Sequence, residues 1–254
     1  MTTQQQQQQI SKMTKPAPNG TAPGNRFTVR KVETDNDLLV SLWVRHRVFA
    51  HEQGFDPLIE HDHYDQDAGT HSWIVFDSAA ELPPAYYADE PVPQDILLPC
   101  KLRTPDQVGL KGSEGGNYTT EDMSVLNERL VAISRAYTDA AKNGPGVAIA
   151  TVRIMFPSKI NTSIYEHEAS IEGSFARLGR LAALPQSRGL GVGKLLMKSA
   201  EEYAKNTLNA GSMVLHAQDH KRRFYESCGF VVHGEDKTYI EEDYPHYLMA
   251  KKLN

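Results

Sequence analysis

Three glycines in the stretch QSRGLGVGK, Gln186 to Lys194, alternate with other residues between two apolar segments. The segment before them, LAALP, is typical of a strand, and the segment after them, LLMKSAEEYA, has the spacing of an amphipathic helix. A strand, a glycine turn and a helix start together present backbone N–H groups that have no partner, and such groups bind anions. The spacing therefore predicts a phosphate-binding loop.

Two common nucleotide-binding motifs do not fit this loop. A Walker A motif requires a glycine where Arg188 stands and a hydroxyl residue where Leu195 stands. The dinucleotide fingerprint G-x-G-x-x-G fails as well, because its last glycine would fall on Lys194 or Leu196. The pattern that remains is Q-x-x-G-x-G, followed by a third glycine and a lysine.

Carboxylate and imidazole side chains concentrate in EHDHYDQD, residues 60–67. Although His, Asp and Glu all bind metals, these residues alternate along an expected loop and match no spaced zinc motif, so we expect no metal site. We expect instead a solvated loop or an acidic lip that attracts a cationic amine. The carboxylates are Glu60, Asp62, Asp65 and Asp67, and the imidazoles are His61 and His63.

The composition limits the class of protein. The chain has 254 residues, enough for one or two domains with a sizeable core. Its 27 basic and 32 acidic residues give a net charge of −5, so we expect no nucleic-acid partner. We also expect no membrane span and no secretory signal. Cys100 and Cys228 are too few for a disulfide framework or a cysteine-rich zinc site, which favours a cytoplasmic or nuclear location.

The chain is expected to consist of a tail and one domain. Six consecutive glutamines followed by Pro, Asn and Gly predict a disordered tail over residues 1–24. The domain then covers residues 25–254. Within it, residues 78–146 are expected to be an insertion, because a proline-rich irregular half precedes a helix that begins at Thr119 or Thr120.

The other segments alternate between strands and helices. A first strand is expected from Arg26, and a helix capped by Asp35 follows it. The glycine loop leads into a helix from Leu190 to about Leu208. The inward residues of that helix are expected to be Leu195, Leu196, Ala200 and Tyr203. Further strands are expected in HSWIVFD, GVAIATVRIMF, ARLGRLAAL, SMVLHAQ, GFVVHGE and YPHYLMAKK.

This order of elements, together with four motifs, resembles the GNAT N-acetyltransferase superfamily. The glycine loop resembles that family's acetyl-CoA pyrophosphate loop, R/Q-x-x-G-x-G/A, and HAQDHKRRFYESCGF resembles its second signature. RHRVFAHEQGFDPLIEHDHYDQD and EEDYPHYLMAKK resemble the N-terminal helix and last strand of the ElaA/YjcF-like branch. The resemblance implies the acyl-CoA N-acyltransferase fold, of class α/β (α+β). In that fold helices flank a mixed central sheet, to which this chain would add the inserted helical and irregular segment.

The resemblance also implies that acetyl-CoA is the co-substrate. In GNAT proteins the fourth strand splays from the fifth, so its free backbone groups pair with the pantetheine arm and polarise the thioester carbonyl. The resemblance places Ala183 and Leu184 at the pantetheine and the amides of Arg188 to Gly193 at the pyrophosphate. The residues expected to bind acetyl-CoA are Ala183, Leu184, Gln186, Arg188, Gly189, Leu190, Gly191, Val192, Gly193, Lys194, Gln218 and Tyr225.

Tyr225 stands at the F-Y position of the second signature, where its phenol is expected to protonate the departing thiolate. Alkylamines are mostly protonated at neutral pH, so a base or a water relay is expected too. The candidate bases are Glu52, His216 and His246, each at a recurrent position of the resembled branch. A packing role for Tyr225, and structural roles for the three candidate bases, stay open.

The acceptor is expected to be a small-molecule amine, such as an amino sugar, a polyamine or an amino-acid-like metabolite. Two alternatives stay open: acetylation of protein lysines or N-termini, and an acyl-CoA-binding regulatory module without turnover. A homodimer is an open expectation as well, because many members of the resembled family dimerise.

Overall fold

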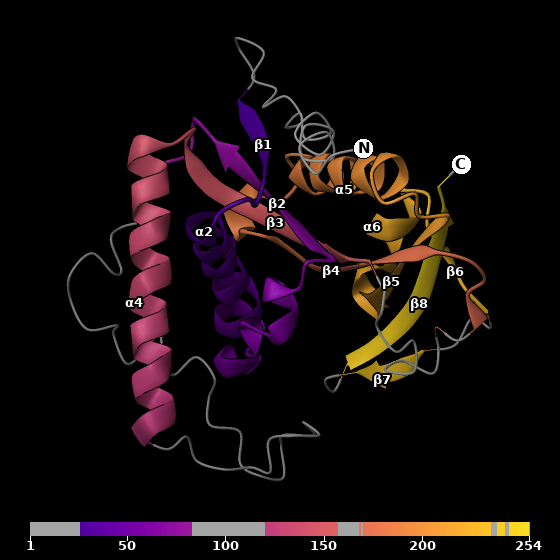
Figure 1. The fold of residues 1–254 in the computed structure, drawn as a ribbon, viewed down its shortest axis with the longest axis horizontal. Helices are drawn as coiled ribbons and strands as arrows, with labels where there is room; N and C mark the ends of the chain where they lie inside the picture. The colour runs from indigo at the N-terminus through magenta and orange to yellow at the C-terminus, as the bar shows by residue number, and fades with distance from the viewer. Residues whose placement is uncertain are drawn as a thin grey trace, which may run out of the picture.

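The computed structural model describes residues 26–82, 120–156, 168, 170–234, 238–241 and 244–253. The predicted tail and most of the proline-rich half of the predicted insertion lie outside these residues. In the part that is described, helices cover both faces of a central mixed sheet, as predicted: α2 and α4 lie on one face and α5 on the other (Figure 1). The helices are α2 (Asp35–Arg45), α4 (Thr120–Asn143), α5 (Val192–Asn206) and α6 (Arg222–Glu226).

The described strands form one sheet in the order β1-β2-β3-β4-β5-β8-β6, with β7 paired to β8. Neighbouring strands in this sheet are antiparallel, except for β4 and β5, which run parallel. Every strand expected from the sequence is present. The strands are β1 (Phe27–Lys31), β2 (Thr70–Asp77), β3 (Val147–Met155), β4 (Phe175–Ala183), β5 (Ser212–Gln218), β6 (Val231–Val232), β7 (Tyr239–Glu241) and β8 (Tyr244–Lys252).

β4 and β5 pair over only part of their length. Their parallel register ends at Leu178 opposite Leu215, whereas β4 continues to Ala183 and β5 to Gln218. The two strands therefore separate toward their carboxyl ends, at the edge where the glycine loop begins.

β4 also carries a bulge beside this opening. The register between β3 and β4 slips between Thr151 and Arg153, so Arg180 and Leu181 together oppose the single residue Val152. Arg180 has a φ of 51°, a left-handed conformation that costs a non-glycine residue about 1–3 kcal/mol. A bulge of this kind changes the direction in which a side chain points.

The start of α2 differs from the prediction. Thr34, not Asp35, is the N-cap, and it forms a capping box with Asp37. The Thr34 hydroxyl accepts the N–H of Asp37 at 3.1 Å, and the Asp37 carboxylate accepts the N–H of Thr34 at 3.2 Å. The prediction of Asp35 was wrong because the reciprocal bond requires an acidic residue one turn after the cap, and Asp37 supplies it. After α2 the chain continues as a π-helical segment, His46–Glu52.

α4 belongs to the hydrophobic core although it lies in the predicted insertion. Its residues Leu126 and Ile133 are fully buried. The ring of Tyr137 stacks on Trp43 of α2, with centroids 3.5 Å apart. The stripe of apolar residues at helical spacing is therefore buried against α2.

The buried face of α5 is rotated slightly from the predicted one. Leu196 and Ala200 are buried as expected, but Leu195 is 36% exposed and Met197 is only 2% exposed. The prediction for Leu195 was wrong because, at 3.6 residues per turn, the stripe that starts at Val192 continues through Leu196 and misses Leu195.

Candidate active site

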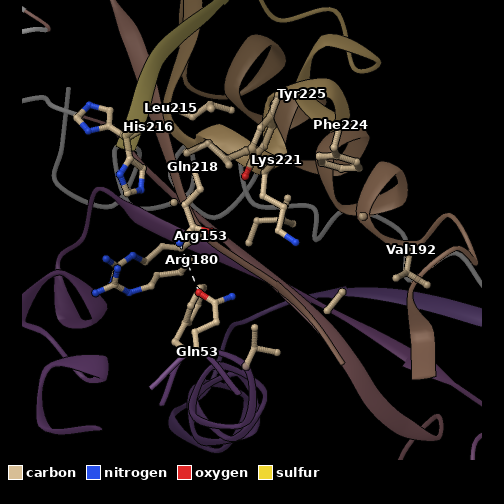
Figure 2. Close-up of a pocket in the computed structure, with 18 of the residues that line it drawn as sticks. Gln53, Arg153, Arg180, Val192, Leu215, His216, Gln218, Lys221, Phe224 and Tyr225 are labelled. Atoms are coloured by element: carbon tan, nitrogen blue, oxygen red, sulfur yellow. Dashed lines mark hydrogen bonds between the residues drawn. The ribbon is translucent and has the colours of Figure 1, made fainter. Parts of the chain in front are cut away.

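A cavity of about 740 Å³ opens where β4 and β5 separate. The glycine loop borders it at one end and a group of arginines and carboxylates at the other, while α6, β5 and β8 contribute the wall between them (Figure 2). A cavity of this size is typical of small-molecule sites. Segments that are distant in the sequence thus meet around one space.

The glycine loop presents backbone donors to this cavity. Gly189 and Gly191 have φ values of 79° and 81°, and no neighbouring atom lies within 4 Å of where their Cβ would stand. The N–H groups of Gly189, Gly191, Val192 and Gly193 find no acceptor among the described residues, and all four residues line the cavity. The N-terminus of α5 lies at the same place, so its dipole also favours an anion.

Other residues of the loop shape the turn. The N–H groups of Arg188 and Leu190 donate within the loop, to the carbonyls of Pro185 and Ser187 at 3.2 and 3.3 Å. Leu190 and Gln186 are exposed, and neither is among the described residues that line the cavity. The predicted set of pyrophosphate donors is thus reduced to the four N–H groups that face the cavity.

Gly193 is required by packing. A Cβ at Gly193 would lie 3.0 Å from the ring of Phe224, so the glycine lets α6 approach the first turn of α5. The same contact brings the helix with Phe224 and Tyr225 to the wall of the cavity.

Tyr225 points its hydroxyl into the cavity (Figure 2). Its ring lies between Phe224 and Phe230, with centroid distances of 5.2 and 6.2 Å. Burial raises the pKa of Tyr225, so the phenol keeps its proton at neutral pH. We find no acceptor for this hydroxyl within the described parts of the chain, and it is therefore available to a ligand.

Comparison with known proteins shows which family the part of the chain around this cavity is similar to. Residues 162–253, which include the glycine loop and Tyr225, match the family described as "Acetyltransferase (GNAT) domain". This carboxyl-terminal part of the chain is thus similar to GNAT acetyltransferase domains. This match supports the predicted class of enzyme, an acyltransferase.

Solved structures share the fold of this protein. A putative N-acetyltransferase from Lactobacillus plantarum superposes with a TM-score of 0.52 and 17% identity, over 91% of this chain and 100% of that chain. Escherichia coli ElaA superposes with a TM-score of 0.50 and 17% identity, over 89% of this chain and 99% of that chain. At these identities the likeness establishes the fold alone.

One curated relative matches part of the chain. The uncharacterized protein YyaT of Bacillus subtilis (strain 168) is 30% identical over 94 residues, which is 37% of this chain and 62% of that protein. The chain thus spans less than two thirds of that relative's length. In the part of the chain that is described, no helix is long and apolar enough to cross a membrane.

The structure brings one of the two expected pantetheine residues to the cavity. Ala183 lines it, and the Ala183 carbonyl accepts a hydrogen bond from Nε of Arg188 at 3.1 Å. Leu184 is buried, its N–H donates to Ile149 at 2.9 Å, and its carbonyl accepts the Ser187 N–H at 2.9 Å. Leu184 therefore has no backbone group left for a ligand.

Gln218 lies at the end of β5 and lines the cavity. Its Nε2 donates to Oε1 of Gln53 at 3.5 Å, across the opening (dashed line in Figure 2). Gln53 follows the π-helical segment, so the two amides connect the wall formed after α2 with the wall formed by β5.

Glu52 is engaged outside the cavity. Its two carboxylate oxygens accept hydrogen bonds from Arg188 at 2.7 and 2.5 Å, and both side chains are more than a third exposed. Glu52 is not among the described residues that line the cavity. The geometry gives it a positioning role toward Arg188 and no direct access to an amine in the cavity.

His216 is part of a buried ion network. Its Nδ1 lies 2.8 Å from Glu241 and its Nε2 lies 2.9 Å from Glu168, which also accepts from Arg177 at 2.7 Å. Burial alone would lower the pKa of His216, but the hydrogen bonds to the two carboxylates outweigh it and raise the pKa. Both ring nitrogens then donate, so His216 has no lone pair with which to act as a base.

His246 is oriented differently. Its Nδ1 lies 2.9 Å from the carbonyl oxygen of Tyr244, so Nδ1 carries the proton and Nε2 keeps its lone pair. His246 lines the cavity opposite Gln218 in the pairing of β5 with β8. Of the three candidate bases, His246 is the one whose ring nitrogen the geometry leaves able to accept a proton.

The expected acidic lip is instead a network of ion pairs. Arg45, which is 1% exposed, bonds Asp65 at 2.7 Å, and Arg153 bonds Asp62 at 2.7 and 2.8 Å and Asp65 at 2.9 Å. Burial would raise the pKa of Asp62, but the Arg153 hydrogen bonds outweigh it and lower the pKa. The expectation of a solvated or amine-attracting lip was wrong for Glu60, Asp62 and Asp65, because arginines from other elements neutralise these carboxylates. Asp67 and His63 are exposed, as expected for a solvated loop.

The cavity residues that the sequence analysis did not predict include Gln53, Arg153, Arg180 and Lys221. Lys221 stands between Gln218 and the F-Y pair, and Gln53 ends the R-x-x-V-F-x-x-E-Q stretch, so the motifs themselves contained a signal for both. Lys221 and Lys194 are exposed at the cavity and add positive charge beside the loop. Together with the four backbone donors, they fit the phosphates of acetyl-CoA.

Proposed function

We propose that this GNAT domain transfers the acetyl group of acetyl-CoA to the primary amine of a small molecule, by direct attack in a ternary complex. The observation that carries the proposal is the continuous cavity, along which the unpaired N–H groups of the glycine loop and the hydroxyl of Tyr225 face the opening between β4 and β5. Its volume of about 740 Å³ supports a small acceptor.

The binding residues hold the co-substrate by its charge. The N–H groups of Gly189, Gly191, Val192 and Gly193 donate to the pyrophosphate, and Lys194 and Lys221 add charge-assisted contacts. The end of β4 at Ala183 borders the position where the thioester is expected, next to the separated strands.

The reacting residues then move two protons. Nε2 of His246 accepts the proton that the amine loses as its nitrogen bonds to the acetyl carbon. When the carbon–sulfur bond breaks, the Tyr225 hydroxyl gives its proton to the departing thiolate. Solvent returns a proton from His246 to Tyr225, so both residues are restored and the products are an amide and the free thiol.

The experiment follows free thiol while the protein is incubated with acetyl-CoA and separate pools of small amines and peptides. Thiol release that depends on small amines, and that the Tyr225→Phe variant loses, supports the proposal. Release with peptides alone would indicate a protein acetyltransferase, and acetyl-CoA binding without release would indicate a regulatory module. A homodimer and a cytoplasmic or nuclear location remain predictions.

A further inference from the structure

Arg180 is a cavity residue whose donors are unused. Its side chain is 24% exposed and lines the cavity, and its buried Nε has no hydrogen-bond partner. Its nearest carboxylate oxygens, on Glu60 and Asp62, are each 3.6 Å away, longer than a good hydrogen bond. No hydrogen bond from Arg180 to another described residue is found.

The surrounding carboxylates are already occupied. Asp62 and Asp65 accept short hydrogen bonds from Arg153 and Arg45, and the backbone and side chain of Glu60 accept from Arg45. Three carboxylates and the three arginines Arg45, Arg153 and Arg180 leave this end of the cavity with no net charge. A cationic acceptor would therefore have to displace buried ion pairs, whereas an anion would meet unused donors.

The backbone conformation at Arg180 also supports the binding of an anion at this end of the cavity. The bulge and the φ of 51° place this side chain in the cavity, and the ring of Phe49 lies 5.9 Å from its guanidinium. Figure 2 shows Arg153 and Arg180 extending together on the far side of Gln218 from Lys221 and Phe224. The unused guanidinium thus lies at the end of the cavity away from the glycine loop.

We infer that the acceptor of this enzyme carries a carboxylate as well as an amine, as an amino acid does, and that Arg180 binds this carboxylate. The inference rests on the proposed acetyltransferase function. Guanidinium and carboxylate match each other in shape and form two parallel charge-assisted hydrogen bonds, which makes Arg180 a specificity-determining residue.

The test compares amino acids with their carboxamides as acceptors, with kcat/KM expressed per free-base amine. The carboxamide lacks the negative charge, and the correction removes the effect of its less basic α-amine. For the wild-type protein we expect kcat/KM to favour the acid by about tenfold or more, the size of a charge-assisted contact. The Arg180→Gln variant is expected to lose this preference, because its rate with the acid falls toward its rate with the carboxamide, and to keep its binding of acetyl-CoA. The matched control is Arg135→Gln, which removes an exposed arginine of α4 and is expected to keep the preference.

Two results would overturn the inference: equal wild-type rates with acids, carboxamides and polyamines, or an unchanged preference in Arg180→Gln. If acetyl-CoA raises the melting temperature but no acceptor releases thiol, the proposed function fails instead. The carboxylate site is then judged by binding. An amino acid that stabilises the acetyl-CoA-bound wild type but not Arg180→Gln supports the site, and equal stabilisation of both contradicts it.

Discussion

The two ends of the cavity differ in whether their charged and polar groups are already paired within the protein. At the glycine loop the donors are backbone N–H groups without an acceptor in the described structure, and the nearby ion pair of Arg188 with Glu52 is exposed. At the other end, buried carboxylates and guanidinium groups already bind one another, and Arg180 alone of that group makes no hydrogen bond to a described residue. The first end therefore needs a charged ligand to satisfy its donors, whereas the second is neutral before binding and depends on one side chain for selectivity.

The largest effect is expected at Tyr225, which lies in the wall between the two ends of the cavity. Tyr225→Phe removes one oxygen, so turnover should fall by at least about tenfold, within the range of about 10² to 10⁴ for general acid catalysis when water gives no rescue. The affinity for acetyl-CoA should stay within a few-fold. Initial rates and acetyl-CoA titrations measure both quantities, and Tyr247→Phe on β8 is the control tyrosine. A variant that turns over at the wild-type rate would assign Tyr225 to packing.

Breaking the buried ion network around Arg45 should lower the stability of the protein more than breaking a partly exposed ion pair on α6. Arg45→Gln leaves Asp65 with one guanidinium fewer in a buried position, at an expected cost of about 3–5 kcal/mol in the free energy of unfolding. Arg222→Gln, which breaks a partly exposed pair with Glu226 one turn along α6, should cost less than about 1 kcal/mol. Urea unfolding of both variants tests this difference, and equal costs would show that burial gives the ion network no larger share of the stability.

A third prediction concerns the glycine loop alone. Acetyl-CoA at about 100 times its dissociation constant should stabilise the protein by about 2.7 kcal/mol, seen as a rise in melting temperature. Gly191→Asp places a negative charge among the free N–H groups and should abolish this rise. Gly173→Asp is the matched control, because Gly173 has nearly the same φ, 79°, equally open space and a position near the opposite end of β4. A full rise in Gly191→Asp would exclude the loop as the phosphate site.

The His216 network is expected to make stability depend on pH. The pKa of His216 is raised in the folded state, so its contribution is complete below the ordinary value of about 6.5 and is lost as the pH rises through the folded pKa. The pKa values of Glu168 and Glu241 are lowered, so their contribution is lost only in acid, as the pH falls through those folded values. His216→Gln should therefore differ most from the wild type near pH 6 and less at higher pH. A stability difference that grows toward alkaline pH would contradict the charged form of His216.

The same contrast explains what the sequence could predict. The glycine loop depends on neighbouring residues, so spacing was enough to place its turn and the helix after it. The ion network joins residues 60–65 to Arg153 and Arg180, which are far away in the sequence and meet them only through strand pairing. The bulge at Arg180 has no local signal, since it arises from the register between two strands. Leu195 was misplaced because the helix phase depends on packing.

The smallest effect is expected for Glu52→Gln at the glycine-loop end. Both carboxylate oxygens of Glu52 are used by Arg188, and the pair is exposed, so its loss should change the free energy of unfolding by at most about 1 kcal/mol. Turnover should stay within a few-fold and the pH profile should keep its shape, because Glu52 does not face the cavity. His246→Gln, measured beside it, is expected to lose the dependence of the rate on a general base. If Glu52→Gln loses that dependence and His246→Gln keeps it, the base belongs to the exposed pair, and the loop end would supply chemistry as well as binding.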